Sequence, residues 1–104
     1  MKQYAVQIAD RAVADMDAIY AYIAGDLQAP DTAMVQCSRI AQAIESLNVF
    51  PERYKKFESQ PERDLRFRQL PVDNYAAIYV VEGECVTVLR ILYSASDIIA
   101  RLRD

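Results

Sequence analysis

Arg90 is the strongest candidate for a functional residue, because it lies inside the apolar segment VTVLRILYS. A guanidinium in such a segment must find an acceptor or reach solvent at the edge of a sheet. It could support negative charge on a substrate, or form an internal ion pair with an acidic residue such as Asp73 or Asp97. A short hairpin places Arg90 opposite Ala76 or Ala77, whose small side chains would leave room for it above the sheet.

Tyr75, Tyr79 and Tyr93 lie in the last two apolar segments of the chain. Tyrosine can stack on a base or donate a hydrogen bond while still packing as a core aromatic. Tyr79 falls in the middle of an apolar run, which predicts a core position. Tyr93 stands beside Ser94 at the predicted end of a strand, where its hydroxyl can be exposed and either role is open.

Basic residues concentrate in the second half of the chain. Residues 1–50 carry three basic and six acidic side chains, whereas residues 51–68 carry six basic ones, Arg53, Lys55, Lys56, Arg63, Arg66 and Arg68. An acidic partner would therefore meet the second half first. Arg66 and Arg68 are two apart in a predicted strand and so share a face. They form either a basic shelf or a charged edge that protects the sheet against aggregation.

Several classes of function are excluded by composition. The chain has no histidine, which rules out Ser-His-Asp and Cys-His nucleophile systems. It contains no Gly-rich phosphate loop and no zinc-ligand spacing, so we expect neither a metal nor another cofactor. A net charge of −3 is unfavourable for gripping a polyanion unaided.

Cys37 and Cys85 belong to no CxxC motif, and we expect both to be reduced and structural. No apolar run approaches the roughly 18 residues of a membrane span, and the N-terminus lacks the layout of a signal peptide. These features predict a cytoplasmic protein that does not enter membranes.

The first half of the chain predicts one strand and two helices. Tyr4, Val6 and Ile8 alternate with polar or small residues, which is typical of a strand with one face on a core. Asp10 can cap a helix whose end is marked by Gly25 and Pro30, and its apolar stripe consists of Val13, Met16, Ile19, Tyr20, Ile23 and Leu27. A second helix begins near Pro30, with Ala33, Cys37, Ile40, Ile44 and Leu47 on its apolar face.

The second half predicts a loop over residues 52–64 followed by three strands. The first strand starts at Leu65, and Pro71 interrupts its ladder or forces a bulge. Residues 75–81 and 85–93 form a hairpin at the centre of the sheet. Ser94 and Asp97 resemble a capping box that opens a short final helix.

Together these elements predict an α+β fold in a single domain over residues 1–104. The order is β-α-α-β-β-β with a short C-terminal helix, and a mostly antiparallel sheet packs against the helical hairpin.

The spaced patterns ADxDAIYAYIAxxLxAPxTA, IAQAIESLxxFPER and LRxxxLPVDNYAAIYVVEGECVTVLRILYSASDI resemble the RelE/ParE superfamily of bacterial type II toxin–antitoxin systems along nearly the whole chain. The last stretch is closer to the ParE-like, plasmid stabilisation branch. Arg66, Tyr75, Arg90 and Asp97 match the ParE-like pattern, and Tyr93 occupies its usual histidine position. Ala76, Ala95 and Ser96 stand where this branch commonly has arginines.

The resemblance implies three alternative functions. A ParE-like toxin would inhibit growth by poisoning DNA gyrase and blocking replication, and would need no catalytic activity of its own. A RelE-like toxin would be a ribosome-dependent mRNA endonuclease in which Arg90 and Tyr93 are catalytic. The departures from the pattern also leave open an inactive relic that only binds its antitoxin.

The family also implies a cognate antitoxin, usually encoded next door, which wraps the toxin with a helical and extended segment to form a hetero-oligomer. Such binding combines a helix in a groove with strand addition. An acidic antitoxin would pair with Arg53, Lys55, Lys56, Arg66 and Arg68. Tyr75 and Asp97 complete the residues expected to bind the antitoxin or the target.

Overall fold

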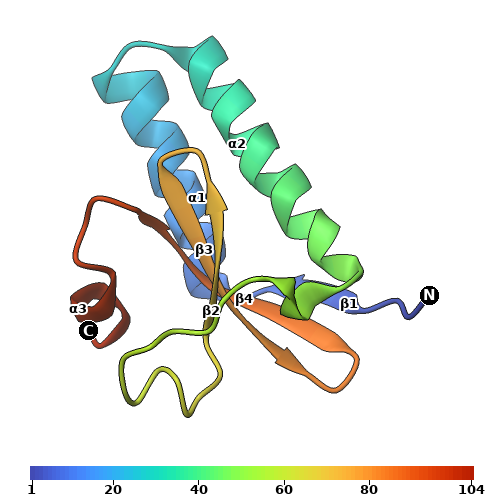
Figure 1. Cartoon of the computed structure of the whole chain (residues 1–104). Coiled ribbons are helices and arrows are strands. Elements are labelled where there is room, and N and C mark those ends of the chain that lie inside the picture. Colours follow the sequence, from blue (N-terminus) through green and yellow to red (C-terminus); the bar gives the residue numbers. More distant parts are fainter.

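A four-stranded sheet organises the computed structural model, which describes all of residues 1–104 (Figure 1). The strand order is β1-β4-β3-β2, and only the β1–β4 pair is parallel. The predicted α+β fold with a mostly antiparallel sheet is therefore confirmed. The strands are β1 (Ala5–Ile8), β2 (Arg68–Val72), β3 (Tyr75–Glu82) and β4 (Cys85–Tyr93).

Two antiparallel helices cover one face of this sheet (Figure 1). The helix α1 (Asp10–Ala21) continues into a π-helical turn over Tyr22–Asp26, and α2 (Pro30–Glu45) begins with Pro30 in its first turn. Asp10 was expected to cap α1, but the capping position is Ala9. Asp10 instead lies in the first turn, where a carboxylate is stabilised by the helix dipole. None of the helices is sufficiently long and apolar to span a membrane.

The main core lies between these helices and the sheet. Ile40 and Ile44 of α2 are buried there, and so are Leu47, in the 3-10 turn that follows α2, and Tyr79. The Tyr79 hydroxyl donates a 2.6 Å hydrogen bond to the carbonyl of Pro51. This bond satisfies the one polar atom of a fully buried ring, and the core position predicted for Tyr79 is confirmed.

The apolar stripe predicted for the first helix faces the core only in part. Ile23 is buried, whereas Val13, Tyr20 and Leu27 are 47%, 40% and 55% exposed. In β1, Val6 packs on the core but Ile8 is 42% exposed. Ile8 lies in a short edge strand, and the far end of α1 extends beyond the sheet.

The β3–β4 hairpin contains a register shift that the sequence did not predict. Its two-residue turn has Gly83 at a φ of 60°, a left-handed conformation that glycine adopts without strain. Tyr79 pairs with Val88 but Ile78 pairs with Arg90, so one extra residue bulges from β4. Arg90 therefore lies opposite Ile78, and the expected position opposite Ala76 or Ala77 is wrong.

The strand β2 begins later than predicted. It starts at Arg68 rather than Leu65, because Arg66 adopts a φ of 63° and belongs to the preceding turn. Pro71 neither interrupts the ladder nor forces a bulge, and it pairs with Ala76 in regular register. An edge strand tolerates proline because a missing N–H can face away from the ladder.

A smaller apolar cluster covers the other side of the sheet. Phe57, Ile78 and Leu92 are buried there beneath Phe67 and the short helix α3 (Ile98–Leu102). Asp97 caps this helix by accepting a 3.1 Å hydrogen bond from the amide of Ala100. Ser94 lies three residues before Asp97, too far from the first turn to be the cap, so the expected capping box is wrong.

Candidate functional site

Arg90 forms an internal ion pair with Asp15 of α1. Its Nε lies 2.8 Å from Oδ2 of Asp15 and its Nη2 lies 3.0 Å from Oδ1, while Nη1 donates to the carbonyl of Arg101 at 3.3 Å. The two side chains are 9% and 15% exposed. The hydrogen bonds to Asp15 raise the pKa of Arg90 above its ordinary value.

Asp15 also supplies a hydrogen-bond acceptor to the unpaired edge of β4. The parallel partner strand β1 ends at Ile8, opposite Val88, so the following β4 amides have no strand beside them. The Oδ2 of Asp15 accepts a 2.9 Å hydrogen bond from the amide of Ile91. Arg90 and Asp15 thus fasten α1, β4 and α3 together, and we call this unit the Arg90–Asp15 brace.

The acidic residues that the sequence offered as partners of Arg90 are committed elsewhere. Asp73 accepts two 2.8 Å hydrogen bonds from Arg39 and one of 3.1 Å from Gln36. The hydrogen bond from Arg39 is the main cause of the lowered pKa of Asp73. Asp97 caps α3. An internal ion pair was one of the two expectations for Arg90, but neither proposed partner is the one that forms it.

Two of the predicted binding cations are engaged with backbone carbonyls. Arg53 donates to the carbonyls of Val49 and Phe50 at 2.7 and 2.9 Å. These bonds stabilise the turn that follows α2. Arg68 donates to the carbonyls of Tyr54 and Glu52 at 2.6 and 3.0 Å, and its side chain is 13% exposed. Both guanidiniums stabilise the chain around residues 46–54.

The basic shelf expected from Arg66 and Arg68 does not form. Arg66 lies in a turn and Arg68 in β2, so the alternation of a single strand does not relate their side chains. Arg66 is exposed, and its side chain makes no hydrogen bond or ion pair. It remains a free cation, whereas Arg68 does not.

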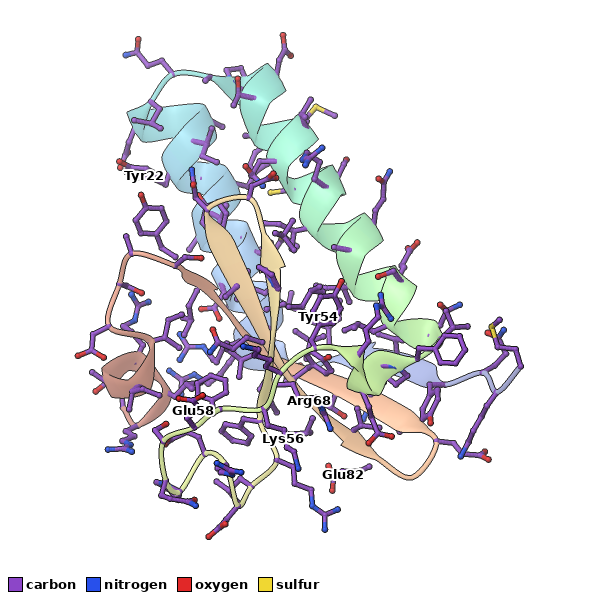
Figure 2. All side chains as sticks on the ribbon, viewed as in Figure 1. Tyr22, Tyr54, Lys56, Glu58, Arg68 and Glu82 are labelled. Atoms are coloured by element: carbon purple, nitrogen blue, oxygen red, sulfur yellow. The ribbon has the colours of Figure 1, made fainter.

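Lys55 and Lys56 line an open cleft of about 450 Å³ next to β2, together with Glu58, Gln69, Ser96 and Asp97. Neither lysine forms an ion pair, and both are exposed. Lys56 forms an isolated antiparallel β-bridge with Arg68 at the start of β2 (Figure 2). We call this cleft the lysine cleft. It brings together three of the residues predicted from the sequence, Lys55, Lys56 and Asp97.

A larger hollow of about 820 Å³ lies between the ends of α1 and β4 and is lined mainly by apolar side chains. The rings of Tyr75 and Tyr93 meet edge to face within it, with centroids 5.8 Å apart. Tyr22 reaches this region from the end of α1 (Figure 2). We call it the tyrosine groove and define it by Ile19, Tyr22, Leu27, Tyr75, Tyr93 and Arg101.

The tyrosine groove contains only two residues of the predicted site, Tyr75 and Tyr93. Burial and the neighbouring Tyr93 raise the pKa of Tyr75. Tyr93 is 50% exposed, as expected for the end of a strand. Sequence reasoning missed Tyr22 and Asp15, although Tyr22 falls beside the apolar stripe of its helix and an aromatic residue there is an available signal.

A buried carboxylate, Glu62, was also missed. It accepts hydrogen bonds of 3.0 and 2.9 Å from Arg103 and one of 2.7 Å from Ser59. Its side chain is 3% exposed, and the bonds from Arg103 lower its pKa to about 2. This pair ties the 57–66 loop to the C-terminal segment, so it holds α3 beside the lysine cleft.

Cys37 and Cys85 are free and half-buried. Burial raises the pKa of the Cys37 thiol. No group of three histidine, cysteine or acidic side chains is placed to hold a metal ion.

Residues 6–98 match the family described as ParE toxin of type II toxin–antitoxin system, parDE. No curated protein matches the sequence. One similar solved structure is the chromosomal ParDE system from P. aeruginosa, with a TM-score of 0.73 and 23% identity over 89% of this chain and 98% of that one. Another is the RelBE2 toxin–antitoxin complex from Mycobacterium tuberculosis, with a TM-score of 0.63 and 17% identity over 92% and 97%.

The two solved structures share the fold of this chain at identities too low to transfer a mechanism. The family match has a different weight, because it spans β1, the helical hairpin, the rest of the sheet and the start of α3. The chain belongs to the ParE family of toxins of type II toxin–antitoxin systems.

Proposed function

We propose that this toxin arrests growth by binding DNA gyrase and blocking replication, and that a cognate antitoxin neutralises it. The observation that carries this proposal is the Arg90–Asp15 brace. Arg90 is the cation on which an RNA-cleaving site would depend, and its donors are engaged with Asp15 and the carbonyl of Arg101. Binding a partner protein needs an exposed surface and leaves this brace intact.

A nuclease makes stricter demands on the same residues. Cleavage of a phosphodiester needs a base, an acid and cationic support for the charge that develops on phosphorus. Tyr93 would supply the acid or base, yet its ring packs against Tyr75 and its hydroxyl makes no hydrogen bond within the chain. No histidine is available to replace it.

The alternative, a ribosome-dependent mRNA endonuclease, is favoured by one observation. The lysine cleft presents two unpaired cations beside the hydroxyl of Ser96 and the carboxylates of Glu58 and Asp97. Under this alternative Lys55 and Lys56, rather than Arg90, would support the phosphate charge.

The antitoxin enters the proposal because both similar solved structures are of toxin–antitoxin systems. Lys55, Lys56 and Arg66 are the cations of the predicted binding set that remain free for an acidic partner. Arg53 and Arg68 contribute less, since their guanidiniums already bind backbone carbonyls. We propose that toxin and antitoxin form a hetero-oligomer.

Induction of the chain without its neighbouring gene tests this function. DNA and protein synthesis are followed separately by pulse labelling, and purified protein is added to a gyrase supercoiling assay. We expect DNA synthesis to fall first and co-expression of the neighbouring gene to restore it. Early loss of protein synthesis would instead favour the endonuclease, and no effect on either process would indicate an inactive relic.

A matched pair of variants separates the two active alternatives. Lys55→Ala with Lys56→Ala should abolish an endonuclease that relies on the lysine cleft, whereas Lys2→Ala, an exposed lysine outside the cleft, should not. Under the gyrase proposal the double variant continues to block DNA synthesis.

A further inference from the structure

We propose that two copies of this chain associate through the exposed ring of Phe50 and the hollow beside it, about a two-fold axis that places each ring in the hollow of the other copy. The hollow measures about 330 Å³ and is lined by Lys2, Tyr4, Phe50, Pro51, Glu52 and Arg53, which we call the Phe50 surface. It shares no residue with the tyrosine groove or the lysine cleft. The inference goes beyond the proposed function and does not depend on it.

The Phe50 surface brings together two distant parts of the sequence. The N-terminal residues run beside the turn that follows α2, where the amide of Tyr4 donates a 2.8 Å hydrogen bond to the carbonyl of Asn48 (Figure 1). Tyr4 is half-buried and packs against the main core, whereas the side chain of Phe50 is 64% exposed. One aromatic ring therefore forms a wall of the hollow, and the other stands exposed beside it.

The backbone of Phe50 has a conformation that the fold of a single copy does not explain. Its φ of 46° and ψ of 50° lie in the left-handed region, where a bulky residue is an outlier and glycine fits without strain. The exposed ring contributes little to the core of its own chain. A strained and exposed phenylalanine is expected where a partner covers the ring, because such strain is typical of binding sites.

Side chains hold this turn in its strained conformation. Each of the four consecutive carbonyls of residues 49–52 accepts a hydrogen bond from a side chain. Arg53 binds the first two at 2.7 and 2.9 Å, the hydroxyl of Tyr79 binds the third at 2.6 Å, and Arg68 binds the fourth at 3.0 Å. The ring of Phe50 is thus presented by a turn that is already ordered, so association costs little loss of backbone freedom.

The position of ring and hollow side by side favours a second copy as the occupant. In a two-fold dimer the same patch lies on both sides of the contact, so a patch that contains both a protruding group and a hollow can complete itself. Phe50 of one copy would enter the hollow bordered by Tyr4 and Pro51 of the other. Two aromatic rings at such a contact can pack edge to face or offset, which adds to the gain from burying their apolar surface.

The charges of the Phe50 surface are complementary to each other. Lys2 is exposed and forms no ion pair, and its ammonium lies 5.3 Å from the centre of the Tyr4 ring. The side chain of Glu52 is 64% exposed and makes one 3.5 Å contact with Arg68. A two-fold contact can pair Lys2 of each copy with Glu52 of the other. A strongly acidic or strongly basic partner would instead meet one of these residues with a like charge.

Sedimentation velocity of the purified chain, over a series of concentrations at low salt, tests the dimer. The contact is small compared with a permanent interface, so we expect a reversible dimer whose fraction rises with concentration. Phe50→Gly should weaken dimerisation about tenfold or more and should keep or raise the unfolding midpoint, because glycine adopts a φ of 46° without strain. Leu65→Ala is the matched control, because Leu65 is a 55% exposed apolar residue outside the Phe50 surface.

A charge exchange tests the pairing across the two-fold axis. Lys2→Glu and Glu52→Lys should each weaken the dimer, because each brings like charges together. The combined variant Lys2→Glu with Glu52→Lys should restore dimerisation, since the exchanged charges again face each other in a contact between copies.

The outcomes decide the inference without reference to antitoxin or gyrase. A chain that stays monomeric at every concentration would overturn it, and so would Phe50→Gly dimers as tight as those of the unmodified chain. A lower unfolding midpoint for Phe50→Gly would also count against it, because the ring would then stabilise the single copy. Loss of antitoxin binding or of gyrase inhibition in Phe50→Gly, with dimerisation unchanged, would give the surface to that partner instead. Failure of the charge exchange to restore the dimer would overturn the two-fold pairing.

Discussion

The tyrosine groove and the lysine cleft both border α3, but they differ in how many of their charged side chains have a partner within the chain. Beside the groove, Asp15 is paired with Arg90 and Asp73 with Arg39, and Arg101 is the one charged side chain of the lining without a partner. At the cleft, Lys55 and Lys56 have no internal partner. Internal pairing lets an apolar contact surface form without the cost of burying a free charge on binding. Unpaired cations leave their attraction for an incoming partner, at a strength that depends on salt.

The largest effect should come from breaking the Arg90–Asp15 brace. Asp15→Ala leaves a guanidinium that is 9% exposed without its carboxylate, and it also removes the acceptor of the Ile91 amide. We expect a loss of about 3–5 kcal/mol in the free energy of unfolding, measured by urea titration. Asp15→Asn should lose less, because an amide still accepts a hydrogen bond. A loss below about 1 kcal/mol for Asp15→Ala would show that the brace contributes little.

The pH dependence of stability should next reveal the Glu62–Arg103 pair beside the lysine cleft. The folded pKa of Glu62 is about 2, below its ordinary value of 4.5. A lowered folded pKa means that the stabilisation is fully present above pH 4.5 and is lost as the pH falls from there towards 2. Glu62→Gln should therefore flatten this acid limb in thermal melts collected across the pH range. Glu58→Gln, an exposed carboxylate on the same loop, is the control and should leave the limb unchanged.

A charge reversal at the lysine cleft should affect association more than folding. Lys55→Glu with Lys56→Glu is expected to slow antitoxin association about tenfold at low salt, and the difference should vanish near 1 M salt, where the Debye length is about 3 Å. The free energy of unfolding should stay within about 0.5 kcal/mol of the original. Stopped-flow binding at several salt concentrations measures the effect. An equal slowing by Lys2→Glu with Arg11→Glu, which changes the net charge by the same amount, would show that the cleft has no special role.

The smallest effect is expected at the exposed pair near the groove. Arg39 is 60% exposed, so water already screens its interaction with Asp73. Arg39→Ala should shift the unfolding midpoint much less than Asp15→Ala, and added salt should reduce the difference further. A shift comparable to that of Asp15→Ala would mean that the Asp73 turn, with its φ of 55°, depends on this arginine.

The predictions from the sequence were correct where the spacing of apolar residues indicates which positions are buried. The spacing of Ile40, Ile44 and Leu47 predicted the buried face of α2 and of the turn after it, and the apolar run around Tyr79 predicted its core position. The predictions failed where strand ends depend on a single backbone conformation. The positive φ of Arg66 moves the start of β2 further along the chain than predicted. The bulge in β4 shifts the partner of Arg90 in β3 by one residue.

The sequence by itself therefore determined the order of elements, the main core and the family, because these follow from periodicity and from residues matched along the chain. Only the tertiary structure decided which polar groups meet. Arg90 finds Asp15 across 75 positions and Arg103 finds Glu62 across 41. Such partners are set by how α1 packs across the end of β1 and how the C-terminal segment folds back. Local periodicity contains no information about either arrangement, so the partners of the charged residues, and with them the tyrosine groove, could be identified only from the folded chain.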